Sequence, residues 1–279
     1  MSCKKWCKST DDLTNIFFLG RTKRDTMAQD LGISKVRELC SINVERLIFE
    51  KSKNKNFLKG FGESTLTQLK KRANILALTK KPVTFGQLEF PRVSVELFFD
   101  IEDDPTQDFV YLHGVYERSI SGSKFIDFTA KGNTPDAEKE AWQRFWEYIR
   151  TLPSDDYAVY YYSHHEKTTY KRLRKKYPEV ISDEELTAFF DSPKVIDLYK
   201  VVLKHTDWPV SSYSLKELAT YLGFKWRDET PSGALSIQWY NDYLKTGDQK
   251  ILNRILEYNE DDCRATMVVK DGIVQLLKK

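Results

Sequence analysis

The run of residues 93–103, VSVELFFDIED, constrains the fold most, because an apolar, β-rich segment delivers two carboxylates at its end. Alternate residues of a strand share a face, so Asp100 and Glu102 point the same way. The run is too apolar for an exposed strand and predicts the buried centre of a sheet. Neighbouring carboxylates repel each other, and a bound divalent cation is the usual way to keep both ionised. The alternative is an ordinary acidic turn leading into the next strand.

A second acidic cluster lies far along the chain, in residues 257–263, EYNEDDC. Apolar residues recur at three- and four-residue steps on both sides of it, which predicts a helix. On that helix Tyr258 and Asp262 are one turn apart and share a face. The carboxylate can then hold a metal ion while the phenol orients a water molecule. A solvated helix face is the alternative.

Taken in order, these motifs resemble the DEDD exonuclease superfamily, in the variant with a tyrosine in its last motif. The resemblance is strongest to the predicted RecB-family nucleases, whose C-terminal half carries such a domain. The segments VIDLYKVV, SSYSLKELATYLGF and ILEYNEDDCRAT are similar to that group. The resemblance covers residues 92–277, and the ordered set of motifs is more specific than any one of them.

The resemblance implies an α/β fold, with a ribonuclease H-like mixed sheet flanked by helices. It also implies 3′-to-5′ exonuclease activity through two Mg²⁺ or Mn²⁺ ions, a mechanism that suits in-line phosphodiester hydrolysis. The implied metal ligands are Asp100, Glu102, Glu166 and Asp262, and Tyr258 is the fifth catalytic residue.

Glu166 departs from the family pattern, which usually has Asp at this position. Glutamate is one methylene longer and can still bind a metal ion. Alternatively, Glu166 is the acidic first turn of the following helix, where the helix dipole favours it. Asp197 ends another apolar run and either faces the same centre or caps the next helix. His164 and His165 are expected to be loop residues, since Mg²⁺ prefers carboxylates.

Between these motifs the pattern predicts a sheet followed by helices. Strands are expected at residues 93–101, 109–117 and 124–129 as an antiparallel meander, followed by a helix at 135–150. Shorter strands are expected at 157–162 and 195–198. The helix at 135–150 carries an apolar stripe that we expect to pack in the core: Trp142, Phe145, Trp146 and Ile149.

The net charge of +3 conceals a marked asymmetry. Residues 1–90 contain 18 Lys and Arg against 9 Asp and Glu, a net charge of +9, whereas the remainder has a net charge of −6. A basic head joined to an acidic body suggests a polyanion-binding module attached to a carboxylate-rich site. We therefore expect two domains, a helical nucleic-acid-binding module at 1–83 and the ribonuclease H-like exonuclease domain at 84–279.

The head contains a segment, FLKGFGESTLTQLKKRA, with the form of a helix-hairpin-helix element. Two glycines allow a tight turn, and the N–H groups at the next helix start can meet a phosphate oxygen without reading a base. An ordinary helical hairpin with a solvated lysine face is the alternative. The expected nucleic-acid contacts are Lys59, Gly60, Gly62, Lys70, Lys71 and Arg72.

The partner expected from this pattern is nucleic acid, DNA in preference to RNA, with a helicase or a RecB-like nuclease domain as a further candidate. The charged N-terminus and the lack of a long apolar run predict a soluble, cytoplasmic protein without a membrane span. Cys3 and Cys7 are too few to make a metal site alone. The competing function is a ribonuclease H-like binding or helicase-associated module that no longer cleaves, and substituted Glu166 is its best support.

Overall fold

The computed structural model describes residues 6–7, 9–153 and 155–278. The chain forms two compact units, each built from separate segments of sequence. The first unit comprises Met1–Gln87, Val202–Tyr221 and Leu276–Lys279, and the second comprises Leu88–Val201 and Leu222–Gln275. Residues far beyond the expected boundary at 83 therefore pack with the N-terminal helices.

The second unit is organised around a five-stranded mixed sheet in the order β4-β3-β2-β5-β6. Strands β2, β3 and β4 are antiparallel, as the meander pattern predicted, whereas β5 and β6 run parallel to β2. The mixed sheet flanked by helices, which the resemblance implied, is confirmed. The strands are β2 (Val95–Asp104), β3 (Phe109–Ser119), β4 (Gly122–Thr129), β5 (Tyr157–Tyr161) and β6 (Val195–Asp197).

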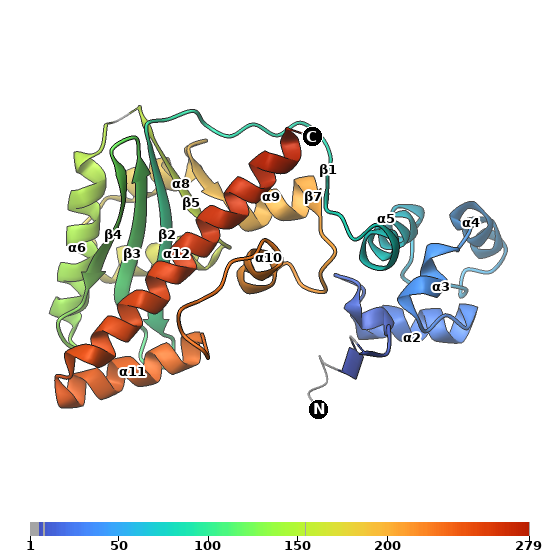
Figure 1. Cartoon of the computed structure of the whole chain (residues 1–279), viewed down its shortest axis with the longest axis horizontal. Coiled ribbons are helices and arrows are strands. Elements are labelled where there is room, and N and C mark those ends of the chain that lie inside the picture. The colour runs from blue at the N-terminus through green and yellow to red at the C-terminus, as the bar shows by residue number, and fades with distance from the viewer. Residues whose placement is uncertain (1–5, 8, 154, 279) are drawn as a thin grey trace. The chain divides into compact units, whose positions relative to one another are not determined.

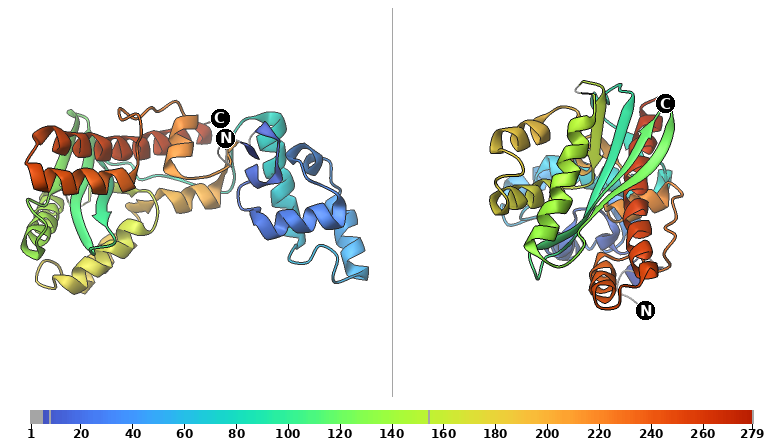
Figure 2. Two further views of the ribbon diagram at one scale, coloured as in Figure 1. Left: turned by 90° about the horizontal axis from the view of Figure 1, so that it is seen from below. Right: turned by 90° about the vertical axis from the view of Figure 1, so that its left-hand side faces the viewer.

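Helices cover both faces of this sheet (Figures 1 and 2), which lies between α6 and α12. Leu97 and Phe99 of β2 pack on the aromatic stripe of α6 predicted to lie in the core, whereas Phe98 packs with Cys263 of α12. The helices of this region are α6 (Pro135–Thr151), α7 (His165–Lys176), α8 (Asp183–Asp191), α9 (Leu198–His205), α11 (Gly233–Thr246) and α12 (Gln249–Leu277).

The first unit is mainly helical and has its own apolar core. The predicted glycine turn is present, and Gly60, with a φ of 83°, lies in it before α5. A second glycine, Gly32, ends α2 in the left-handed conformation. The main helices are α2 (Gly20–Leu31), α3 (Val36–Cys40), α4 (Val44–Lys53), α5 (Glu63–Asn74) and α10 (Leu215–Tyr221).

A short antiparallel pair joins the N-terminal segment of this unit to residues from late in the sequence. Strand β1 (Val83–Thr84) pairs with β7 (Thr206–Asp207). The buried Asp207 carboxylate accepts a hydrogen bond from Arg72 Nε at 2.8 Å. Breaking such a buried pair by removing one partner costs about 3–5 kcal/mol, so this contact anchors residues 202–221 to the helical head.

Among the described residues, no helix has both the length and the apolar character needed to cross a bilayer.

Candidate metal centre

Strand β2 supplies two of the carboxylates, and its successive side chains point to opposite faces of the sheet. Leu97 and Phe99 face α6, so the even-numbered positions, including Asp100 and Glu102, face the side covered by α12. A register shift between Glu102 and Asp103 interrupts the pairing with β3 immediately afterwards. Such bulges are common beside active sites because they re-aim side chains.

Helix α12 supplies the third carboxylate. One oxygen from each of Asp100, Glu102 and Asp262 lies within 4.8 Å of the others, and this is the only such group of three potential ligands among the described residues. Tyr258 is buried one turn before Asp262 and hydrogen-bonds its side chain. The expected shared face of Tyr258 and Asp262 is thus present, with the phenol bonded to the carboxylate itself.

The electrostatics of the cluster are unfavourable without a counter-charge. Burial and the neighbouring Asp262 carboxylate raise the pKa of Glu102 to about 8. Burial, then the charges of Asp262 and Glu102, raise the pKa of Tyr258, so the phenol stays protonated and acts as a donor. A gathering of carboxylates that resists ionisation is a site that either retains a proton or binds a cation.

Three neutral donors surround the carboxylates. The Asn259 amide donates to Asp100 Oδ2 at 2.7 Å and also hydrogen-bonds Glu102. The Tyr111 hydroxyl lies 3.3 Å from Glu102 Oε2 and 2.8 Å from Ser236 Oγ, and Ser236 also bonds Glu102. Sequence reasoning missed all three donors. Asn259 stands inside the acidic motif, but nothing in its spacing shows that it reaches back to β2.

Asp262 is held from the other side by Trp226. The indole Nε1 donates to Asp262 Oδ1 at 2.6 Å. The loop that carries Trp226 is fixed to α12 by Arg227, whose backbone N–H donates to Asp261 at 2.7 Å and whose Nε donates at 3.0 Å. Asp261, next to the expected ligand Asp262, therefore has a structural role, which the sequence did not indicate.

Glu166 does not join the three-carboxylate group. It lies in the first turn of α7, as the alternative interpretation proposed, but its side chain is only 3% exposed rather than solvated. Its Oε2 has no hydrogen-bond partner within the described part of the chain. Burial, then the Asp197 carboxylate, raise its pKa well above the usual range.

The residues around Glu166 form a second polar neighbourhood. Asp197 accepts from the Lys200 backbone N–H at 3.2 Å, which confirms the predicted cap of α9. His165 lies in α7 rather than in a loop, and its Nε2 is 3.1 Å from Asp103 Oδ1. Ser163, just before this helix, has a φ of 106°, a backbone conformation that non-glycine residues rarely adopt and that occurs at functional sites.

The predicted nucleic-acid contacts of the head separate into two groups. Lys59, Gly60 and Gly62 are exposed in the turn before α5, and Gly62 is its N-cap without a side-chain cap. By contrast, Lys70 donates to the Ile42 carbonyl at 2.7 Å. Arg72, expected to be a surface contact, is only 5% exposed because it pairs with Asp207.

Lys71 is exposed, but its Nζ lies 3.9 Å from Asp207 Oδ2 and over the Phe85 ring.

Of the two N-terminal cysteines, Cys3 lies outside the described residues, and Cys7 Sγ accepts a hydrogen bond from the Thr14 hydroxyl at 3.2 Å.

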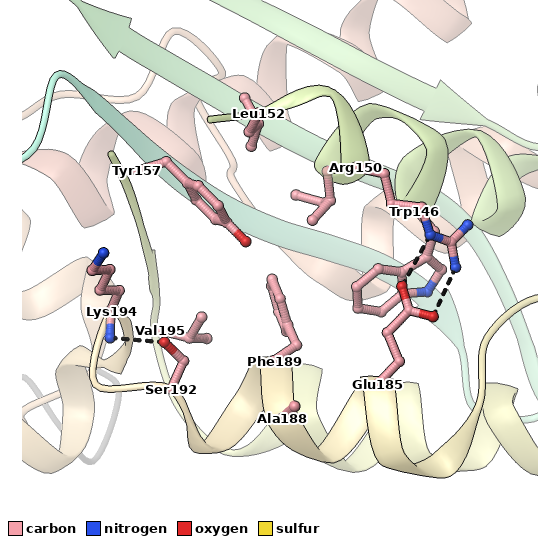
Figure 3. A pocket seen from close by; sticks show the side chains of 11 residues that line it. Trp146, Arg150, Leu152, Tyr157, Glu185, Ala188, Phe189, Ser192, Lys194 and Val195 are labelled. Atoms are coloured by element: carbon pink, nitrogen blue, oxygen red, sulfur yellow. Dashed lines mark hydrogen bonds and ion pairs between the residues drawn. The ribbon is translucent and has the colours of Figure 1, made fainter. Parts of the chain in front are cut away.

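A pocket of about 350 Å³ in the second unit is separate from the carboxylates (Figure 3). It lies where β5 and β6 begin, whereas Asp100 and Glu102 follow the part of β2 that pairs with β5. Aromatic and aliphatic side chains from α6 and α8 line it, and an Arg150–Glu185 ion pair of 2.9 Å stands at its side. None of the three carboxylates Asp100, Glu102 and Asp262 lines it, so it adds nothing to the carboxylate chemistry.

The donor set fits a hard divalent cation. Carboxylate oxygens are the ligands that Mg²⁺ and Mn²⁺ prefer, and the three ligands come from elements fixed by the core. A cation would also relieve the repulsion between Glu102 and Asp262 that the pKa of Glu102 reports.

Glu102 makes the stability of the metal-free protein depend on pH. With a pKa of about 8 in the folded state and an ordinary value near 4.5 when unfolded, the folded protein binds more protons between these limits. The free energy of unfolding should therefore fall as pH rises from about 4.5 to 8. Glu102→Gln should remove on the order of a few kcal/mol of this dependence. Thermal melts in chelator across this pH range measure the dependence of stability on pH. If the stability of the wild type and of Glu102→Gln depended on pH to the same extent, the prediction would be contradicted.

The comparisons with known proteins agree with this geometry. A sequence profile described as the RNase H superfamily matches residues 97–274, more than half of the chain. No curated protein and no solved structure matches significantly. Members of the superfamily are generally phosphodiester hydrolases that use divalent metal ions, and the acidic cluster is compatible with such a nuclease-type activity. The match contains most of β2, the carboxylates and most of α12, and the chain belongs to the RNase H superfamily.

Proposed function

We propose that this protein is a nuclease that hydrolyses phosphodiester bonds of nucleic acid, acting as a 3′-to-5′ exonuclease with divalent cations. The observation that carries the proposal is the convergence of Asp100, Glu102 and Asp262, of which the first two lie about 160 residues from the third. Superfamily membership supports the same reaction class.

In the proposed reaction the carboxylates and Tyr258 have different roles. Asp100, Glu102 and Asp262 would hold Mg²⁺ or Mn²⁺. When bound, such ions neutralise charge developing on the phosphate and lower the pKa of the attacking water. Tyr258 keeps its proton, so its hydroxyl can donate to Asp262 and orient that water, but cannot act as a base.

Glu166 is the proposed fourth ligand, for a second cation. The support is its buried Oε2, which lacks a hydrogen-bond partner among the described residues. A buried, unpaired carboxylate oxygen is costly, and coordination of a cation would compensate that cost. Without a cation, burial and the neighbouring Asp197 carboxylate raise the pKa of Glu166 well above the usual range and so favour its protonated form.

The test uses 5′-labelled oligonucleotides of DNA and RNA, single-stranded and duplex, with Mn²⁺, Mg²⁺ or chelator. Stepwise shortening from the 3′ end with either ion, and its absence in chelator, is the expected result. Cleavage of a circular substrate would show endonucleolytic action. Binding without cleavage of any substrate would overturn the proposal in favour of an inactive nucleic-acid-binding module.

The head is proposed to hold the nucleic-acid backbone through the turn between α4 and α5. Lys55 and Lys59 are exposed there, and the α5 N-terminus presents N–H groups after the uncapped Gly62. Lys51 closes the turn by donating to the Phe57 and Leu58 carbonyls and is part of its structure. Because Arg72 is buried in its ion pair, we leave it out of this proposed contact surface.

Salt dependence of binding tests this surface. The affinity falls as salt rises, and each lost phosphate contact should reduce the steepness of log affinity against log salt by about one. Lys55→Ala/Lys59→Ala should therefore make this slope shallower by about two. Glu63→Gln, which removes an exposed carboxylate from the first turn of α5, should strengthen binding.

Lys250→Ala, an exposed lysine at the start of α12, is the matched control. An unchanged slope in the double variant would exclude this turn as the contact surface.

A further inference from the structure

Gly114 of β3 marks an unusually close approach between the sheet and α12. It pairs directly with Asp100, and the structure gives it no positive φ that would require glycine. A Cβ built at this position would lie 1.7 Å from Asn259 Oδ1 and 2.9 Å from its Cγ. No heavy atoms approach so closely without bonding, so the space that any larger residue would need is filled by the Asn259 amide.

The Asn259 side chain occupies that space and from there hydrogen-bonds the Asp100 and Glu102 carboxylates. It is fully buried, donates to Asp100 Oδ2 at 2.7 Å and hydrogen-bonds Glu102. One turn later Cys263 Sγ is 3.5 Å from the Gly114 carbonyl oxygen, so α12 meets β3 at this glycine through two successive turns. The contact fixes the height and rotation of the helix that also carries Tyr258 and Asp262.

We propose that Asn259 is the positioning residue of the metal centre, and that Gly114 provides the clearance which lets its amide hold Asp100 and Glu102 together. The inference rests on the proposed function, because it concerns carboxylates that bind a cation. An amide can donate two hydrogen bonds and adds no charge, so it orients both carboxylates without competing with the cation. Partners of this kind typically change metal affinity or activity by about 10–100-fold when removed.

Two single substitutions should give the same defect by opposite routes. Asn259→Ala removes the donor, and Gly114→Ala keeps every polar group but forces the amide away from the carboxylates. Both should weaken Mn²⁺ binding, measured by calorimetry or by the resonance of free Mn²⁺, by about 10–100-fold. Turnover should fall while KM for an oligonucleotide stays near the wild-type value, because neither residue is placed against the substrate.

The double variant Gly114→Ala/Asn259→Ala separates positioning from general damage. With the amide gone, the closest remaining neighbour of the added methyl is Phe125 Cε2 at 3.0 Å, which needs only a small shift of that ring. The double variant should therefore bind Mn²⁺ no more weakly than Asn259→Ala alone. Such non-additivity is the mark of residues that act through one contact. Asn253→Ala, an exposed asparagine on the same helix, is the matched control and should bind Mn²⁺ like the wild type.

The outcomes remain distinguishable. If the wild type binds Mn²⁺ and cleaves, and both single variants do so equally well, the positioning role is wrong while the proposed function stands. If the wild type neither binds Mn²⁺ nor cleaves, the proposed function fails first. Should Asn259→Ala not fold, as judged by its thermal transition, Gly114→Ala decides alone, and wild-type Mn²⁺ affinity in that variant would overturn the inference.

Discussion

Asp100→Asn is expected to lower Mn²⁺-dependent cleavage by at least about 10³-fold, because one ligand is lost from a centre worth several kcal/mol of transition-state stabilisation. The substitution is nearly isosteric, and the new side-chain oxygen can still accept the hydrogen bond from Asn259. The loss of activity should therefore come from the metal centre rather than from disturbed packing. Cleavage of a 3′-ended oligonucleotide across a Mn²⁺ titration measures it.

Thermal stability supplies the independent measurement for Asp100. Without metal, the variant should melt at the wild-type temperature or above it, since one of three clustered negative charges is removed. Added Mn²⁺ should stabilise the wild type by binding only its native state, and should stabilise the variant much less. Asp127→Asn, the same exchange at an exposed position of β4, is the matched control. Equal stabilisation of both proteins by Mn²⁺ would show that Asp100 is not a ligand.

Much of the fold and the core of the site could be predicted because local periodicity decides them. The apolar run before Asp100 fixed the central strand, and period-two alternation fixed the shared face of Asp100 and Glu102. Helical spacing likewise placed Tyr258 beside Asp262. The convergence of the two motifs was implied by the resemblance and agrees with the cluster in the structure.

The remaining features depend on contacts between residues far apart in the sequence, which a local sequence pattern does not predict. The bond from Asn259 to Asp100 spans 159 residues, and the ion pair between Arg72 and Asp207 spans 135. Arg72 follows two exposed or half-exposed lysines and has the same charge, so spacing alone assigned it to the surface. Only the return of residues 202–221 to the helical head buries it.

Glu166 shows a different limit of sequence reasoning. Its two interpretations were a metal ligand and an acid in the first turn of the following helix, and neither addressed whether the side chain is buried. The structure places it in the first turn of α7 yet buries it beside Asp197. Burial of a helix-start acid depends on the packing of α7 against the sheet, which residue type and spacing do not encode.

Tyr258→Phe is expected to lower turnover by roughly 10²-fold, within the range for a positioned group that handles protons. The ring packs edge-on against Trp239, with centroids 6.2 Å apart, and phenylalanine retains that contact. Tyr243→Phe, from the same apolar cluster, is the matched control.

The Mn²⁺ response of Tyr258→Phe separates its two candidate roles. Trp226 still donates to Asp262 in this variant, so the carboxylate should remain in place. If the hydroxyl orients the attacking water, turnover falls while the stabilisation by Mn²⁺ stays at the wild-type level. A parallel loss of Mn²⁺ stabilisation would instead show that the hydroxyl acts by holding Asp262. A large drop in the metal-free melting temperature would mean that the bond between Tyr258 and Asp262 supports the fold itself, and would remove Tyr258 from the proposed catalytic set.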